Sequence, residues 1–333
     1  GRILIHPTNP DVVFAAAMGH LYGPQEERGV FRTIDGGATW ERVLFVEPDT
    51  GASDIAMHPG NPRILYAGTW PMLIRTWGRW SGGPGGGLFR STDGGVSWSA
   101  PDPNSPARRV SGGSFNPCKI DTAPGDPDTV YLANYSGTTP SVFCTSRLME
   151  NASGGAAGAW TDMGVSANNC RDPWVVTHPD QGGDPDLFEV YFGDSVRMRR
   201  QVCDGTTTPR CLTGDANWPT ADAGSHSDTS DVEFDPTVAN GCPIFLTSDG
   251  GNATSSDCGA NWVDGNRGLH ALDVVTFSGT VQGGGLTDLY AGTQDNGIYV
   301  TQDNSTTWDR PVGADGYNVL ADREAPARVF YRQ

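Results

Sequence analysis

The chain has 333 residues, 37% of them hydrophobic, with 45 glycines, 24 prolines and a formal net charge of −17. A chain this acidic, whose one lysine is Lys119, repels nucleic acid and anionic membranes. Its apolar runs are also shorter than the ~18 residues that cross a bilayer. We therefore expect no nucleic-acid partner and no membrane insertion, and we expect short strands with tight turns instead of long helices.

Pairs of short apolar segments recur along the chain, and in six copies the turn between the two segments contains proline. Proline cannot donate to a strand ladder, so it marks the turn. Each pair predicts the first two strands of a repeating unit. In chain order the pairs are 3–5 with 12–14, 55–57 with 64–67, 120–122 with 130–132, 175–177 with 190–192, 232–234 with 244–246, 274–277 with 289–291, and 319–321 with 329–331.

A second motif follows these pairs, and it reads Ser/Thr-x-Asp-x-x-x-Ser/Thr/Asn-Trp. Its aspartate is expected to accept hydrogen bonds from the turn, and its indole to pack between neighbouring units. These structural positions are Asp35 with Trp40, Asp93 with Trp98, Asp257 with Trp262, and Asp303 with Trp308. Trp160 and Trp218 recur at the same place without the Asp-Gly turn.

Together the motifs predict an all-β fold, a β-propeller of four-stranded antiparallel blades with six full blades and part of a seventh. The predicted blades are 1–45, 53–100, 117–163, 173–219, 230–264, 272–310 and, in part, 318–333. We expect one propeller over residues 1–333, within a longer polypeptide, because a ring that stops mid-blade leaves an unpaired edge. Any signal peptide is expected to lie outside this chain.

The tryptophan motif resembles the Asp-box, or BNR repeat, of sialidase-like propellers. Residues 27–40, 50–54, 81–93, 292–297 and 313–317 resemble exported bacterial proteins with sortilin (VPS10)-like propellers, which are often described as glycosyl hydrolases. The resemblance implies an extracellular or cell-surface protein. The sialidase Phe-Arg-Ile-Pro motif is absent.

Seven cysteines are present and none forms a Cys-x-x-Cys pair, so a zinc or redox motif is not expected. Cys203 and Cys211 are placed to close a small loop, and Cys242 and Cys258 flank an expected hairpin. Disulfides suit an exported protein.

Three aspartates are candidate catalytic residues. When the units are aligned, the start of the innermost strand carries Arg2, Asp54, Lys119, Trp174, Asp231, Asp273 and Asn318. Two carboxylates facing a central opening, drawn from Asp54, Asp231 and Asp273, would serve as general acid and base on a glycoside. The alternative is that they line a wet channel, bind a cation or satisfy loop amides. We expect each of them to face water, so that replacement by asparagine leaves folding intact.

A glycine-rich insertion at 70–87 carries the clearest ligand-binding candidates, Arg75, Trp77, Arg79 and Trp80. Flat aromatic faces suit sugar rings or peptide side chains, and arginine forks suit carboxylates. The alternative is a folded-back loop whose tryptophans fill a gap between blades.

Polar loop motifs in the second half add His226, Gln294 and Tyr317 as ligand-binding candidates. If these loops share a face, the oxygens of Asp228, Asp249, Asp295 and Asp315 are candidates for binding Ca²⁺. The alternative is ordinary Asp-Gly turn chemistry. No cofactor is expected to be required.

The favoured interpretation is a non-enzymatic binding or scaffold module for a glycan or protein ligand. The first alternative is a glycoside hydrolase that uses aspartates at the central opening. The second is a subunit of an extracellular assembly, self-assembled through strands that a neighbouring chain adds beside residues 319–331.

Overall fold

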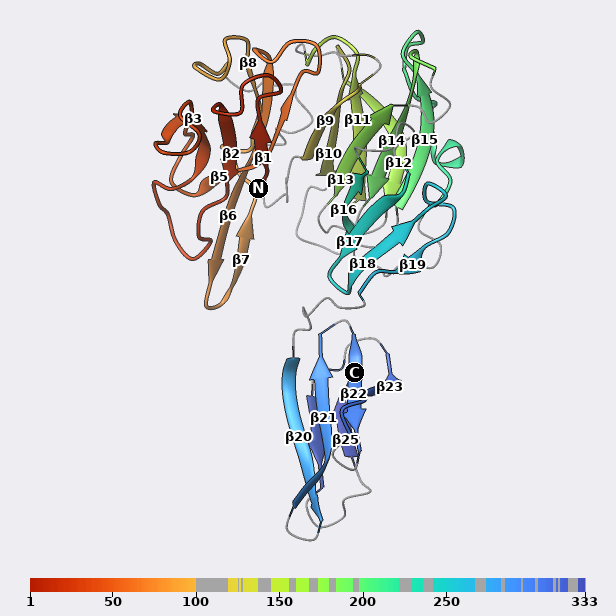
Figure 1. Ribbon diagram of the computed structural model, residues 1–333. Coiled ribbons are helices and arrows are strands. Elements are labelled where there is room, and N and C mark those ends of the chain that lie inside the picture. Colours follow the sequence, from red (N-terminus) through yellow and green to blue (C-terminus); the bar gives the residue numbers. More distant parts are fainter. Residues whose placement is uncertain are drawn as a thin grey trace. The chain divides into compact units, whose positions relative to one another are not determined.

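The computed structural model describes residues 1–99, 119–124, 126, 128–136, 145–155, 160–167, 173–179, 184–193, 198–221, 229–235, 242–266, 274–282, 285–294, 296–302, 305–313, 316, 318–322 and 329–332 (Figure 1). It divides into two compact units, residues 1–247 with 254–263 and residues 248–253 with 264–333. Several predicted site residues lie outside the described residues: His226, Asp228, Asp273, Asp295, Asp303, Asp315 and Tyr317. Arg79 is described in its backbone alone.

The first unit is a series of antiparallel sheets whose strands pair in chain order. Blade 1 contains β1 (Ile3–Ile5), β2 (Val13–Ala17), β3 (Gly29–Thr33) and β4 (Glu41–Leu44). Blade 2 contains β5 (Thr50–Met57), β6 (Leu65–Arg75) and β8 (Gly87–Ser91), with β7 (Gly78–Ser81) also paired to β6. Blade 3 contains β9 (Lys119–Thr122), β10 (Val130–Ser136), β11 (Thr145–Asn151) and β12 (Thr161–Ala167).

Two further blades complete this series. Blade 4 contains β13 (Trp174–Pro179), β14 (Leu187–Gly193) and β15 (Met198–Asp204), followed by the 3₁₀ turn η1 (Asp215–Asn217). Its expected fourth strand is reduced to a bridge between Arg199 and Thr220. Blade 5 contains β16 (Thr229–Phe234), β17 (Ile244–Ser248), β18 (Gly251–Ser255) and β19 (Val263–Asp264), and the tip of its β17–β18 hairpin belongs to the second unit.

The second unit repeats the same topology. Blade 6 contains β20 (Val274–Gln282), β21 (Gly285–Thr293), β22 (Gly297–Thr301) and β23 (Asp309–Val312). A two-stranded sheet follows, made of β24 (Asn318–Ala321) and β25 (Val329–Arg332). Its buried Val319 and Ala321 pack with Tyr290 and Ile298 of blade 6.

The first strands of successive sheets lie beside one another. In the first unit β5 contacts β9, β9 contacts β13 and β13 contacts β16, and in the second unit β20 contacts β24. Sheets that meet through their first strands are arranged as propeller blades, with the first strand innermost. The predicted fold class is therefore confirmed: the chain is an all-β propeller fold built of four-stranded antiparallel blades. Among the described residues no helix is long and apolar enough to cross a membrane.

The proline turns close as their sequence predicts. After the innermost strand, His6 N–H donates to Val12 O and His58 N–H to Ile64 O, both at 3.0 Å. The His58 ring accepts a bond from Gly60 N–H at 3.1 Å through Nδ1. The recurring histidine is thus used within its own turn.

Apolar clusters fill the spaces between consecutive blades, and a tryptophan of the later blade joins each cluster. Trp98 packs on a cluster shared by blades 1 and 2, Trp160 on one shared by blades 2 and 3, and Trp218 on one shared by blades 3 and 4. Trp218 is 1% exposed, whereas Trp40 is 45% and Trp308 40% exposed. The inter-blade packing expected of these indoles is thus confirmed within the first unit at Trp98, Trp160 and Trp218.

The motif aspartates organise their own turns. Asp35 accepts bonds from Thr33 Oγ1 (2.7 Å), Thr39 N–H (2.9 Å) and Thr39 Oγ1 (2.6 Å). These bonds lower the pKa of Asp35 to about 2, and equivalent bonds to Asn261 and Ser255 lower that of Asp257 to about 2. Asp93 makes the same set of bonds, with Ser97 contributing most to its lowered pKa.

Blade 3 builds a related turn from a different residue. Asn151 is fully buried, and its Oδ1 accepts bonds from Ser153 N–H (2.9 Å) and Gly155 N–H (3.2 Å). In blade 2 the corresponding glycine amide, on Gly95, donates to Ser91 Oγ. The turn therefore persists in blade 3 although the Asp-Gly sequence is lost.

Two of the expected disulfides are confirmed, Cys203–Cys211 and Cys242–Cys258. The first closes a loop of blade 4 that also docks on blade 3. There the fully buried Glu150 accepts bonds from Arg210 N–H (2.8 Å) and Cys211 N–H (3.2 Å), and Arg210 Nε lies 2.6 Å from Asp126 Oδ2. The disulfide loop thus fastens two consecutive blades together. Cys118, Cys144 and Cys170 lie outside the described residues.

Candidate functional site

The most exposed aromatic group of blade 2 lies on an arm formed by β6 and β7. The inner strand β5 pairs with β6 only as far as Pro71, and β8 pairs only as far as Thr69. Beyond that point Met72–Arg75 pairs with Gly78–Ser81 as a two-stranded ribbon. Figure 1 shows this ribbon continuing past the other strands of its sheet. We call residues 72–81 the β6–β7 arm.

The arm is anchored on one side by the β2–β3 loop of blade 1. Ile74 N–H donates to Leu21 O at 2.6 Å. Arg28, which is fully buried, donates to Asp49 O, Met72 O and His20 O at 2.8, 2.9 and 2.9 Å. One guanidinium therefore joins the loop, the start of blade 2 and the base of the arm. Such a network fixes the arm before any ligand arrives.

The tip of the arm presents aromatic and cationic side chains to solvent. Trp77 is 81% exposed and Trp80 is 42% exposed. The guanidinium carbon of exposed Arg75 lies 5.8 Å from the centroid of the Trp77 ring, within cation–π range. The structure thus brings three predicted ligand-binding residues, Arg75, Trp77 and Trp80, into one exposed arm.

Sequence reasoning missed a further aromatic residue, Tyr22, near this arm. Tyr22 follows Leu21, whose carbonyl accepts the arm's backbone bond, and its side chain is 79% exposed. The arm residues Met72 and Leu73 are buried beneath this surface. Nothing in the loop sequence marks Tyr22, because its position beside the arm depends on the Arg28 network.

Of the other ligand-binding candidates, the structure describes Gln294. Gln294 is partly buried in the second unit, where its carbonyl accepts a bond from Asn296 N–H at 2.7 Å. His226 and Tyr317 lie outside the described residues, as do Asp228, Asp295 and Asp315 of the predicted Ca²⁺ site. Asp249 is the described member of that set. Calcium binding therefore stays a prediction.

A second candidate site is a cluster of charges on the innermost strands of the first unit. Burial lowers the pKa of Arg2, but Asp54, followed by Asp121, Asp231 and Glu233, raises it by more. Lys119 acts on Asp231 from the same cluster. The alignment of units thus predicted the meeting of Arg2, Asp54, Lys119 and Asp231, and it missed Asp121 and Glu233. Trp174 of the same alignment is instead buried, donating to Thr229 O at 3.1 Å.

The expectation that Asp54 faces water is wrong, because its side chain is fully buried. Its Oδ1 lies 3.1 Å from Arg2 Nε, and its Oδ2 accepts a bond from Ile120 N–H of the next blade at 2.8 Å. Asp121 repeats the second contact one blade later, accepting Thr177 N–H at 2.7 Å. In these two blades an inner-strand carboxylate therefore holds the following blade.

Hydroxyl groups make the same type of link in the second unit. Thr276 Oγ1 accepts Val319 N–H at 3.0 Å, and Ser278 Oγ accepts Ala321 N–H at 2.9 Å. The acceptor lies on β20 and the donor on β24, the next innermost strand. We call all four contacts, the two made by carboxylates and the two made by hydroxyls, the forward links.

Burial raises the pKa of Asp121 to about 6, with Arg2 opposing the shift. Burial likewise raises the pKa of Asp231, and burial together with Asp231 raises that of Glu233. Carboxyl groups that hold a proton near neutral pH are the kind that serve as general acids. Burial in a structural cluster raises the pKa of a carboxyl group in the same way, so these shifts do not by themselves assign a catalytic role.

The raised pKa of Asp121 gives a pH prediction. Between pH 3.8 and about 6 the folded protein holds a proton that the unfolded chain releases, so the free energy of unfolding falls as pH rises through this window. The drop expected from this one group is about 3 kcal/mol. Asp121→Asn, which keeps an acceptor for Thr177, should flatten the curve relative to wild type in urea titrations at pH 4, 5 and 6. Parallel curves would contradict the assignment.

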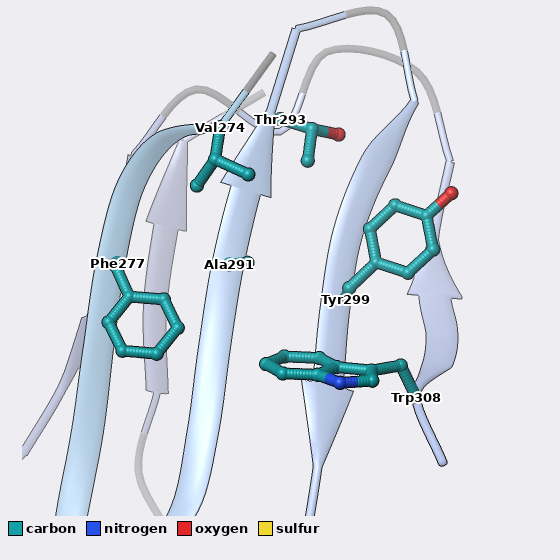
Figure 2. Close-up of a pocket in the computed structure, with 6 residues that line it drawn as sticks. All are labelled: Val274, Phe277, Ala291, Thr293, Tyr299 and Trp308. Carbon is teal, nitrogen blue, oxygen red and sulfur yellow. The ribbon is translucent and has the colours of Figure 1, made fainter. Parts of the chain in front are cut away.

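The second unit contains an apolar hollow of about 330 Å³ on one face of blade 6. Figure 2 shows Phe277, Tyr299 and Trp308 around it, with Val274, Ala291 and Thr293 completing the lining. In blades 2, 3 and 4 the equivalent tryptophan packs against an inter-blade core. We assign no ligand to this hollow.

Comparison with known proteins gives structural similarity at low sequence identity. No protein-family model and no curated protein matches the sequence. Among solved structures, YCF48 from Cyanidioschyzon merolae is 16% identical with a TM-score of 0.43, covering 99% of this chain and 91% of its own. A structure of YCF48 bound to D1 peptide is 13% identical with a TM-score of 0.42, covering 99% and 92%. The GH74 xyloglucanase from Xanthomonas campestris is 13% identical with a TM-score of 0.38, covering 96% and 51%. At these values no function is transferred to this chain.

Proposed function

We propose that this chain is the binding module of an exported, sortilin-like Asp-box propeller, and that it presents the β6–β7 arm to a glycan or protein ligand. The observation that carries the proposal is the exposure of Trp77 and Trp80 on an arm fixed from below by buried Arg28. Solvent-exposed indoles on a rigid arm are suited to ligand contact, because stacking a ligand on them costs little additional conformational entropy. The two disulfides favour an oxidising compartment, which agrees with export.

The test is a screen of glycans and peptides against wild-type protein and Trp77→Ala. We expect the substitution to weaken binding on the order of 10-fold or more, because a stacked indole is a typical hot spot. Phe245→Ala, which removes another half-exposed aromatic from β17, is the matched control and should bind as wild type does. Equal binding by wild type and Trp77→Ala would place the ligand site elsewhere on the propeller.

A glycoside hydrolase is the second candidate, supported by the raised pKa values of Asp121 and Asp231, both of which interact electrostatically with Asp54 and Arg2. Two nearby carboxyl groups with different proton affinities are the requirement of this chemistry. Hydrolysis of a panel of chromogenic glycosides, lost in both Asp121→Asn and Asp231→Asn, would support this function over binding alone.

Assembly through the last described sheet is a third candidate. Leu320 and Phe330 face each other across β24 and β25 and are 64% and 60% exposed. A strand pair with an exposed apolar face suits completion by further strands. Concentration-dependent sedimentation, abolished by a Leu320→Asp and Phe330→Asp double variant, would support it.

A further inference from the structure

We infer that the ligand of the β6–β7 arm is an acidic oligosaccharide whose sugar rings carry carboxylates. This inference rests on the proposed function and narrows its ligand. The inference rests on Trp77 and Arg75, which lie together at one exposed tip. Among the described residues no ion pair between the Arg75 guanidinium and a carboxylate is seen.

The arm lies in the part of the sequence that is free of acidic residues. Residues 55–92 contain no aspartate or glutamate, although the chain has 39 acidic residues in total. The same stretch carries Arg63, Arg75, Arg79 and Arg90. Two of these arginines belong to the arm, so the arm is locally cationic on a protein whose net charge is −17.

The overall negative charge does not prevent an anion from reaching this tip. Fields of exposed charges are screened beyond about 8 Å at physiological ionic strength, so nearby groups decide the local potential. Asp49 lies at the base of the arm, where its carbonyl accepts Met72 N–H at 3.0 Å and its carboxylate acts on buried Arg28. Arg75 lies farther along the arm with its side chain exposed, so it is the charged group that an anion meets at the tip.

The geometry of the tip fits one sugar residue. The apolar face of a pyranose ring stacks on an indole, and a uronic acid carries its carboxylate on the rim of that same ring. The Arg75 guanidinium carbon lies over the Trp77 ring, 5.8 Å from its centroid, so a sugar that stacks on this indole face replaces the cation–π contact and takes the guanidinium fork at its side. Trp80 and Tyr22 offer further exposed aromatic surface for neighbouring sugars.

The exposed groups favour a saccharide over a membrane surface. Segments that enter a bilayer interface present aliphatic side chains to the acyl region as well as aromatic ones. Here Met72 and Leu73 are buried and Ile74 is half-buried. The exposed side chains of the tip are therefore aromatic, cationic or small.

The experiment is isothermal titration of the whole chain with a galacturonic acid hexamer and with cellohexaose, at 50 and 500 mM NaCl. We expect the hexauronate to bind at least 10-fold more tightly than the neutral hexamer at low salt, and to weaken at high salt. Arg75→Gln should reduce hexauronate affinity at least 10-fold and change cellohexaose affinity less than twofold. Arg63→Gln, an exposed arginine before the other end of β6, is the matched control and should change neither.

The outcomes separate this inference from the proposed function. Equal affinity for the two hexamers, or hexauronate binding that Arg75→Gln leaves unchanged, would overturn the acidic ligand while the binding function stands. If neither hexamer binds but the arm retains a Trp77-dependent peptide ligand, the saccharide is likewise refuted. Trp77- and Arg75-dependent binding to phosphatidylglycerol vesicles, without hexauronate binding, would replace it with a membrane surface. If no tested glycan, peptide or vesicle binds in a way that depends on Trp77, the proposed function itself is refuted.

Discussion

Asp54→Ala is expected to lower the free energy of unfolding by about 3–5 kcal/mol. The substitution leaves the guanidinium of Arg2, whose side chain is 29% exposed, without its closest carboxylate. It also removes the acceptor of Ile120 N–H, a buried amide on the next blade. Removing one partner of a buried ion pair costs this much because the other charge stays desolvated.

Urea unfolding at pH 7 measures this free energy, and two further variants serve as comparisons. Asp54→Asn retains an acceptor for Ile120 but loses the charge, so it should fall between wild type and Asp54→Ala. Glu41→Ala breaks an exposed ion pair, in which Glu41 is 72% exposed beside Arg32, and should cost about 0–1 kcal/mol. A loss below about 1 kcal/mol for Asp54→Ala would show that the forward link contributes little to stability.

Arg28→Met is expected to cost about 2–4 kcal/mol and to release the β6–β7 arm. Methionine fills much of the same volume but leaves the carbonyls of His20, Asp49 and Met72 without their donor, and each unsatisfied buried group costs about 1–3 kcal/mol. Water that enters the vacated space should offset part of the sum.

Two measurements on Arg28→Met separate its effect on global stability from its effect on the arm. Urea unfolding reports the global loss, and hydrogen exchange reports the arm, where the Ile74 amide that bonds Leu21 O should exchange faster. Ligand affinity at the arm should also fall, although no exposed contact residue has changed. Arg63→Met replaces an exposed arginine of blade 2, the blade that carries the arm, and should leave stability, exchange at Ile74 and ligand affinity as in wild type. Unchanged exchange at Ile74 would show that the arm is held by its strand pairing alone.

The strand order of the blades was predictable from sequence because the information is local and repeated. Apolar pairs around a proline turn mark the first two strands, and the indole marks the end of the blade. The Cys203–Cys211 and Cys242–Cys258 pairs were likewise predictable, since each closes a short loop. The arm was also visible, because three tryptophans in a glycine-rich insertion do not fit the repeat.

What the sequence did not reveal depends on contacts between distant segments. Arg28 follows two glutamates and looks like an exposed charge, yet it is buried because carbonyls from its own loop, from the β4–β5 loop and from strand β6 converge on it. Asn151 carries no Asp-Gly signal, although it supplies the turn acceptor. Asp54 was expected in water because the start of an innermost strand faces the central opening, but this position does not tell whether the next blade covers the side chain.

The forward links have a consequence for how such a chain can lengthen or shorten. Each donor amide relies on an acceptor from the blade before it, as Ile120 relies on Asp54 and Thr177 on Asp121. A duplication that copies one whole repeat in frame carries that repeat's acceptor, such as Asp121, into the junction that it creates. A cut or graft within a repeat separates the donor from the acceptor. Repeat-sized steps are thus the natural unit of change in this architecture, and chimaeras joined at blade borders should fold more readily than those joined inside a blade.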